Sequence, residues 1–166
     1  MKRFAIAGFA LAALAAAIPA RAAEPALLNG WMRPAAAGTP SIDAYVDIRS
    51  DVALKLVAAS TPAAKRVDLV AGTFSDKGYE TKVVTTFDVP AKGELRFALR
   101  GNVLRFVEVQ KSFGNSDPVP LRLEFRDADG KTLVATTTLE VRGLLAPRPV
   151  QSGPPPLEPT SPAPMK

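Results

Sequence analysis

Apolar and polar residues alternate with a period of two over much of the chain between residues 25 and 143, the pattern of strands with one buried face. The alternation is unbroken in Leu121–Arg126 and in Leu95–Arg100. In Ala135–Val141 it places Thr136, Thr138 and Glu140 on the outer side. Shorter runs rich in β-branched residues predict further strands at Ala44–Ile48, Leu54–Ala58, Val67–Val70 and Thr81–Phe87.

Turn-forming residues separate these runs, at Asp129-Gly130, Gly101-Asn102, Pro90–Gly93 and Gly114–Pro118. No 12-residue segment beyond the first 22 residues keeps a helical period. Roughly seven to nine short antiparallel strands in one domain predict an all-β fold, a Greek-key barrel or sandwich. The chain has no cysteine, so we expect this domain to be held by packing alone.

The first 22 residues have the pattern of a secretory signal peptide. Lys2 and Arg3 precede the apolar run Phe4–Ile18, and Ala20-Arg21-Ala22 predicts cleavage before Ala23. The apolar run of about 15 residues is shorter than the roughly 20 that a membrane-spanning helix needs. We therefore expect a periplasmic protein that is not inserted in the membrane after cleavage. Because no cysteine follows the run, we expect no lipid-anchored form.

Proline dominates the C-terminal segment 144–166, which holds 8 of the 16 prolines of the chain. Each proline fixes φ and removes an amide donor, which favours a disordered or polyproline-II tail. The tail is either passive or a docking segment, and Pro154–Pro156 is the feature that favours docking. The predicted organisation is thus a signal peptide (1–22), a β-domain (23–143) and a tail (144–166).

The net charge changes when the signal peptide is removed. The chain has 21 basic and 16 acidic residues, a net charge of +5. Loss of Lys2, Arg3 and Arg21 leaves 18 against 16, or +2. With so small an excess, and with no aromatic residues interleaved among the basic ones, we expect no nucleic-acid partner. The strands carry five arginines that we expect on a solvated face beside acids such as Glu124: Arg96, Arg100, Arg105, Arg122 and Arg126.

The chain contains no histidine and no cysteine. The usual ligands of zinc, copper and haem and the usual catalytic base are therefore missing. Two enzymatic arrangements stay open, a Ser–Lys pair and a pair of carboxylates. Ser60, Ser75 and Ser112 lie near lysines without a local signature, and Asp127 and Asp129 are better explained by a hairpin turn than by a calcium loop. We expect a protein that is not an enzyme and has no cofactor.

Five segments in order resemble the PCu(A)C (PCuAC) periplasmic copper chaperones. The similarity covers about residues 27 to 141, and the order and spacing of the segments, more than any one motif, carry it. The resemblance implies a cupredoxin-like β-domain. The segments are Trp31–Pro34, Ala44–Ile48, Leu56–Ala64 with Val67–Leu69, Val89–Gly93, and Leu121–Phe125 with Asp129-Gly130.

The copper ligands of that family are spaced as His, ten residues, Met, 21 residues, then His-x-Met. An ungapped placement puts these ligands at Val70, Thr81, Val103 and Arg105. A one-residue insertion within residues 74–78 would shift the last three to Lys82, Leu104 and Phe106. Neither register supplies a ligand of the family type. Beyond the signal peptide only Met32 and Met165 carry a thioether.

The favoured hypothesis is an exported, non-enzymatic domain of PCu(A)C type without the copper site, which binds another envelope protein or a small ligand. Arg105 is then a candidate contact for an anion or a carboxylate of the partner, unless it only faces solvent. The alternative is a copper chaperone that uses a non-consensus site or ligands supplied by a partner. An enzyme that uses carboxylates or a Ser–Lys pair is the third hypothesis.

Overall fold

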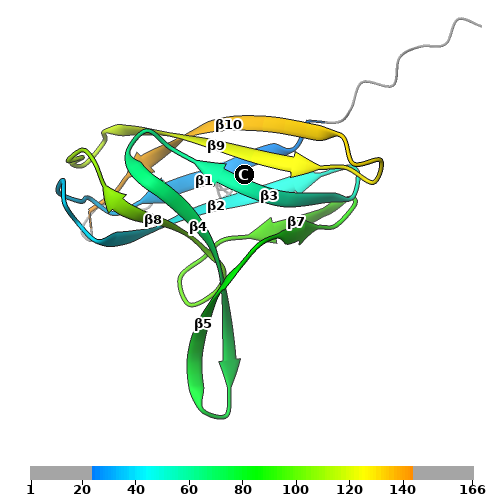
Figure 1. Ribbon diagram of the computed structural model, residues 1–166, viewed down its shortest axis with the longest axis horizontal. Helices are drawn as coiled ribbons and strands as arrows, with labels where there is room; N and C mark the ends of the chain where they lie inside the picture. Colours follow the sequence, from blue (N-terminus) through cyan, green and yellow to red (C-terminus); the bar gives the residue numbers. More distant parts are fainter. Residues whose placement is uncertain (1–23, 144–166) are drawn as a thin grey trace, which may run out of the picture.

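The computed structural model describes residues 24–143, and the predicted signal peptide and tail lie outside them (Figure 1). This part of the chain is built of strands, which confirms the all-β prediction, and it contains no helix that could cross a membrane. The strands are β1 (Ala26–Met32), β2 (Ser41–Ser50), β3 (Leu54–Ser60), β4 (Ala64–Ser75), β5 (Gly78–Val84), β6 (Phe87–Val89), β7 (Gly93–Arg96), β8 (Val103–Val109), β9 (Pro118–Arg126) and β10 (Thr132–Val141).

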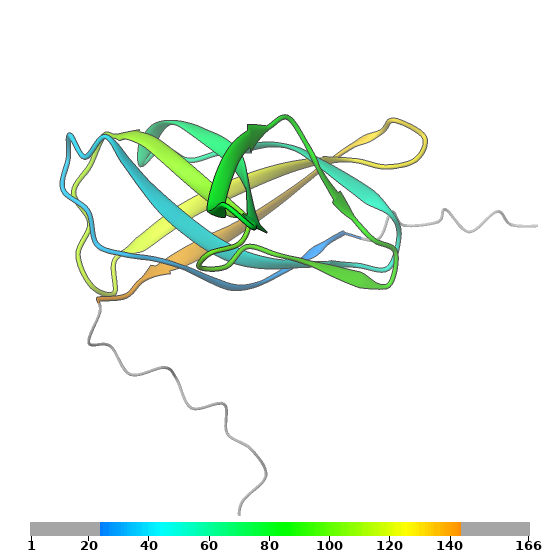
Figure 2. The same ribbon diagram turned by 90° about the horizontal axis from the view of Figure 1, so that it is seen from below.

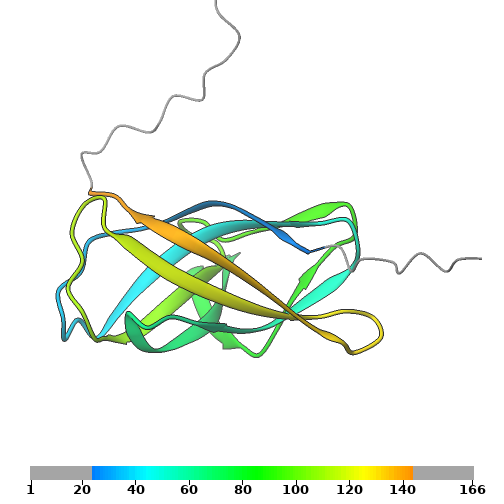
Figure 3. The same cartoon turned by 90° about the horizontal axis from the view of Figure 1, so that it is seen from above.

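Backbone pairing joins the strands in the order β5-β4-β8-β2-β1-β10-β9-β3-β6, and β7 also pairs with β2. The path does not return to its start, so the sheet is not closed into a barrel. It folds over instead, with β9 and β10 above and β8, β4 and β7 below (Figures 1 and 3). Of the two predicted forms, the structure is therefore the sandwich. The pairs are antiparallel except β1 with β10, which run parallel.

The core lies between the two layers and follows the predicted alternation. In β9, Leu121, Leu123 and Phe125 are buried while the residues between them face outward. Met32 of β1 and Phe106 of β8 belong to the same core and are fully buried. Burying one such side chain stabilises the fold by about 1.5–3 kcal/mol. The core therefore holds without disulfides.

Two predicted strands are shorter in the structure. The run Leu95–Arg100 leaves the sheet after Arg96, because a turn closed by the Gly101 amide on the Ala98 carbonyl reverses the chain. Arg100 has a positive φ of 60° in this turn. The reversal sends β8 back between β2 and β4, where it pairs with both. The run Thr81–Phe87 is divided between β5 and β6.

The β4–β5 hairpin projects from the body of the domain (Figures 1 and 2). Its apolar side chains are unusually open to solvent, with Phe74 64 % and Val83 60 % exposed. Tyr79 packs against Phe74 and donates a hydrogen bond of 3.1 Å from its hydroxyl to the Gly101 carbonyl. This bond ties the hairpin to the turn before β8.

Candidate functional site

The candidate site lies on the face of β4, β8 and β2 that points away from the core, here called the outer face. Neighbouring residues of a strand point to opposite sides of the sheet. Leu104 and Phe106 of β8 belong to the core, so Val103 and Arg105 between and beside them lie on the outer face. The hairpin continues this face onto β5.

The four positions of the ungapped family register lie together on the outer face. Val70 of β4 is directly opposite Val103 of β8, and Arg105 lies two residues further along β8. Thr81 of β5 is opposite Gly72, two residues beyond Val70 on β4. The shifted register scatters its positions: Lys82 lies on the reverse side of β5, and Leu104 and Phe106 are fully buried in the core. Only the ungapped register gathers its positions on one face.

A small apolar cluster separate from the main core occupies the centre of the outer face, here called the outer cluster. It consists of Tyr45, Val70 and Val103 with Trp31 packed against them. Val70 and Val103 are only 1 % and 3 % exposed, and the rings of Trp31 and Tyr45 lie 4.5 Å apart. Burial, and then the charge of Asp43, raises the pKa of the Tyr45 hydroxyl. The aromatic rings of Trp31 and Tyr45 thus pack with Val70 and Val103, the two positions that the ungapped register assigns to histidine.

Arg105 forms an ion pair next to the outer cluster. Its Nε donates to Asp43 Oδ1 at 2.8 Å, and a second guanidinium nitrogen lies 3.3 Å from Oδ2. This hydrogen bond to Asp43 raises the pKa of the Arg105 guanidinium, against the opposing effect of its partial burial. Asp68 is opposite Arg105 on the other side, in β4. The charge of Arg105 is therefore largely balanced, and an anion would have to compete with Asp43.

An open depression of about 270 Å³ borders the ion pair. It combines charged groups with the exposed side chain of Leu99. Arg33 has no ion pair among the described residues. The depression is lined by Arg33, Ser41, Ile42, Asp43, Tyr45, Leu99 and Arg105.

The residues on the outer face do not fit a copper ion. Valine has no donor atom, and the guanidinium of Arg105 would repel a cation. Residues 24–143 contain no group of three or more potential carboxylate ligands. The thioether of Met32 is fully buried in the main core, and Met165 lies outside the described residues. The residues of this face therefore provide no donor set for copper.

Ser112, Ser75 and Asp127, three of the candidates for catalysis or calcium binding, form hydrogen bonds with the backbone instead. Ser112 accepts a hydrogen bond from the Ala37 amide at 2.9 Å, and Ser75 bonds within the β4–β5 turn. Asp127 accepts the amides of Asp129 and Lys131 at 3.0 and 2.8 Å, which forms the expected hairpin turn. No nucleophile–base pair arises among these residues.

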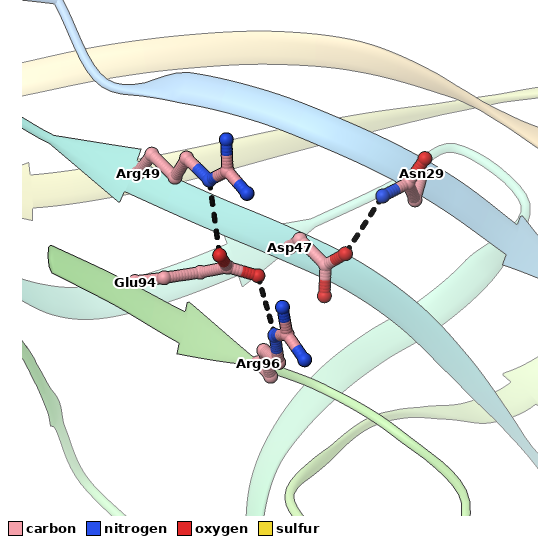
Figure 4. Close-up of polar contacts among 5 residues, drawn as sticks. All are labelled: Asn29, Asp47, Arg49, Glu94 and Arg96. Atoms are coloured by element: carbon pink, nitrogen blue, oxygen red, sulfur yellow. Dashed lines mark hydrogen bonds and ion pairs between the residues drawn. The ribbon is translucent and has the colours of Figure 1, made fainter. Parts of the chain in front are cut away.

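A cluster of charges lies on the same side of the sheet at the β7 end (Figure 4). Glu94 accepts from Arg96 at 2.6 Å and from Arg49 at 3.0 Å, and Asn29 donates to Asp47 at 2.8 Å. Arg96 first, and then Arg49, lower the pKa of the Glu94 carboxyl. A depression of about 570 Å³ adjoins this cluster. Its charges are already paired with one another, so we assign it a structural role.

Sequence reasoning missed three members of the site. Trp31 and Tyr45 belong to the family pattern, which gives them no role at the site, and Asp43 lies outside that pattern. The alternation in Asp43–Tyr45 places both residues on one side of a strand, which was the available signal. Their contacts with β8 depend on the β2–β8 register, which the sequence does not show.

Several solved structures share this fold, and two of those named below are PCuAC domains. The apo PmoF2 PCuAC domain matches with a TM-score of 0.56 and 14% identity, over 74% of this chain and 93% of that one. The apo PCuAC domain from PmoF1 gives 0.53 and 16%, over 72% and 95%. Apo-DR1885 from Deinococcus radiodurans gives 0.51 and 22%, over 86% and 97%. At these identities the likeness shows the fold alone.

The chain belongs to the LpqE-like family. The family profile, described as "Putative lipoprotein LpqE-like", matches residues 26–137. This match and the fold confirm the predicted resemblance at the level of the family. A comparison with curated proteins found no match.

Proposed function

We propose that this protein is an exported, non-enzymatic binding domain that keeps the PCuAC scaffold, lacks its copper site, and contacts a protein partner through the outer face. One observation carries the proposal. Val70 and Val103, the two positions that the ungapped register assigns to histidine, are buried together with aromatic rings, and Arg105 is held by Asp43. At the positions where a copper site would need metal ligands, this protein therefore has apolar packing and an ion pair.

The shape of the outer face favours a protein partner over a small ligand. Small-molecule sites are concave and enclose most of the ligand surface. The depression beside Arg105 is open, and its lining includes the exposed Leu99 and the charged Arg33. Protein interfaces combine an apolar centre with a polar rim, and Leu99 with the neighbouring charged groups would provide one small element of each.

The metal part of the proposal is tested by titrating the purified protein with copper(I) in competition with a chromophoric chelator. We expect the protein to leave the copper with the chelator, because no donor set is available. Stoichiometric withdrawal of copper from the chelator would contradict the proposal. It would instead favour a non-consensus copper site.

The partner part is tested by site-specific photo-crosslinking in cells. A photoreactive amino acid in place of Leu99 should yield a discrete crosslinked product, because Leu99 is exposed in the lining of the depression. The matched control is the same replacement at Val134 of β10, which is exposed on a different part of the molecule. Equal products from both positions, or none from Leu99, would count against a docking role of the outer face.

Export is proposed to depend on residues 1–22, with cleavage before Ala23. Mass spectrometry of the intact protein from the periplasmic fraction should give the mass of a chain that begins at Ala23. A protein retained in the cytoplasm with its first residues intact would refute this part of the proposal.

A further inference from the structure

Strand β5 is a long open edge of the sheet. It stands at one end of the strand order, so its second edge pairs with no strand in the described part of the chain. β6, at the other end, has three residues and is followed by Pro90, which limits further pairing. β5 has seven residues, none of which is buried. Such an edge offers a row of free amide and carbonyl groups for pairing with another strand.

The side chains of β5 are self-complementary about Thr81. In an antiparallel pair of two β5 strands centred on Thr81, Glu80 of each strand is opposite Lys82 of the other. Tyr79 is opposite Val83 in the same arrangement. Both pairs occur twice, because the two strands are related by a two-fold axis. Opposite charges and aromatic–β-branched pairs are favourable cross-strand neighbours.

Of the registers centred on Glu80, Thr81 or Lys82, only the one centred on Thr81 places opposite charges together. A two-fold axis between antiparallel strands places one residue opposite its own copy. Centring the axis on Glu80 would bring two carboxylates together, and centring it on Lys82 would bring two ammonium groups together. Like charges directly opposite one another are destabilising. The charges of β5 therefore favour Thr81 as the centre over either of its neighbours.

The apolar residues of the hairpin support the same arrangement. Tyr79 and Val83 lie on the outer face, across from Phe74 and Val70 of β4. In the dimer, the exposed Phe74 and Val83 of both copies would form one apolar row across four strands, β4 and β5 of each copy. Glu80 and Lys82 would pair on the reverse side of the same sheet. The hairpin projects from the body, so a second copy can approach it (Figure 1).

We propose that two copies of this chain associate through β5, antiparallel and centred on Thr81, to form one continuous sheet across the dimer. This association differs from the partner contact proposed above, because it uses the open backbone edge of β5, whereas the partner contact is placed at the depression beside Arg105. The dimer is tested by measuring the oligomeric state. That measurement does not depend on whether the protein binds copper or another protein.

Charge reversal tests the register. Sedimentation velocity of the purified protein, over a range of concentrations, should show a reversible dimer. Glu80→Lys alone or Lys82→Glu alone places like charges opposite each other twice, and each should weaken the dimer roughly tenfold or more. The double variant Glu80→Lys/Lys82→Glu should restore it, because the swapped charges pair again. The matched control is Lys77→Glu in the hairpin turn, outside the paired residues, and it should leave the dimer intact.

A crosslink tests the centre of the interface. Opposed residues of antiparallel strands have Cα atoms about 4.5–5.5 Å apart, within the range of a disulfide. The chain has no cysteine, so oxidised Thr81→Cys protein should form a covalent dimer. Thr136→Cys, on an exposed position of β10, should not. A monomer at every concentration, or a dimer that ignores both single reversals, would overturn the proposal.

Discussion

Val70 and Val103 lie directly opposite each other on β4 and β8, on the outer face and almost without exposure. In the ungapped register of the family pattern, these two positions correspond to the histidine ligands. Tyr45 and Trp31 pack with the valine pair here. The scaffold therefore brings the right positions together and fills them with side chains that stabilise by packing.

Restoring the ligands should restore copper binding. The variant Val70→His/Thr81→Met/Val103→His/Arg105→Met places two imidazoles and two thioethers on one face, a donor set suited to copper(I). We expect stoichiometric binding in the chelator competition, in which the unchanged protein is expected to bind none. Thr81→Met/Arg105→Met is the matched control and should bind far more weakly. If the four-residue variant stays inert, these positions do not form a site on this backbone.

Met32 should behave as a core residue. Met32→Ala should lower the free energy of unfolding by about 2–5 kcal/mol, because it leaves a cavity in the main core. Met32→Leu conserves volume and should cost less than about 1.5 kcal/mol. Urea titration measures both values. A copper affinity that disappears in the leucine variant would show that the thioether serves as a ligand.

The Arg105–Asp43 pair should show a modest coupling. A double-mutant cycle with Arg105→Gln and Asp43→Asn is expected to give about 1 kcal/mol or less, because both side chains are partly open to solvent. The coupling should shrink at high salt. Zero coupling at low salt would mean that the two groups do not interact in solution.

Glu94 should link stability to acid pH. Its carboxyl pKa is held below the ordinary value of 4.5, so the unfolded chain takes up this proton more readily than the folded one. The stabilisation is therefore complete above about pH 4.5 and is lost as the pH falls through the lowered pKa. Glu94→Gln should reduce the melting temperature at pH 7 and make no difference at the acid end of that range.

The control for this pH dependence is Glu24→Gln. Glu24 borders the same depression and takes no part in the Glu94 ion pairs. Its loss should leave the difference between acid and neutral pH unchanged. An equal effect of both variants would assign the pH dependence to net charge rather than to the Arg49–Glu94–Arg96 contacts.

Gly72 should tolerate no side chain. A Cβ at this position would lie 2.3 Å from the Gly101 carbonyl oxygen and 2.5 Å from the Tyr79 hydroxyl. Gly72→Ala must therefore displace the turn before β8 or the tyrosine, at a cost of about 1–3 kcal/mol. Thermal unfolding measures the loss. Tyr79→Phe removes only the hydrogen bond and should cost less; an equal loss in both would assign the effect to that bond.

The sequence predicted the strands that have one buried and one solvated face. β9 and β10 alternate cleanly for this reason. β8 was missed because Val103 and Leu104 are both buried, one in the outer cluster and one in the main core, which hides the period of two. β1 was missed because its pairing with β2 shifts between Leu28 and Trp31.

The candidate site was predictable in its positions and not in its contacts. The family spacing located Val70 and Val103, and the structure places both on one face. The Asp43–Arg105 ion pair joins residues 62 apart in the chain. Its formation depends on the side-by-side placement of β2 and β8, which no local pattern of residues specifies.

The parallel pairing of β1 with β10 gives the domain a mechanical axis. Met32 lies beside Val141, so the chain enters at the far end of β1 and leaves about 20 Å away along the strands. Tension between the two ends would pull these strands in opposite directions along their length. The bonds at the two registered pairs, Trp31 with Glu140 and Met32 with Val141, would then be loaded together, in shear, instead of opening one after another. The domain is thus connected to the rest of its chain in the orientation in which a sheet best resists being pulled apart.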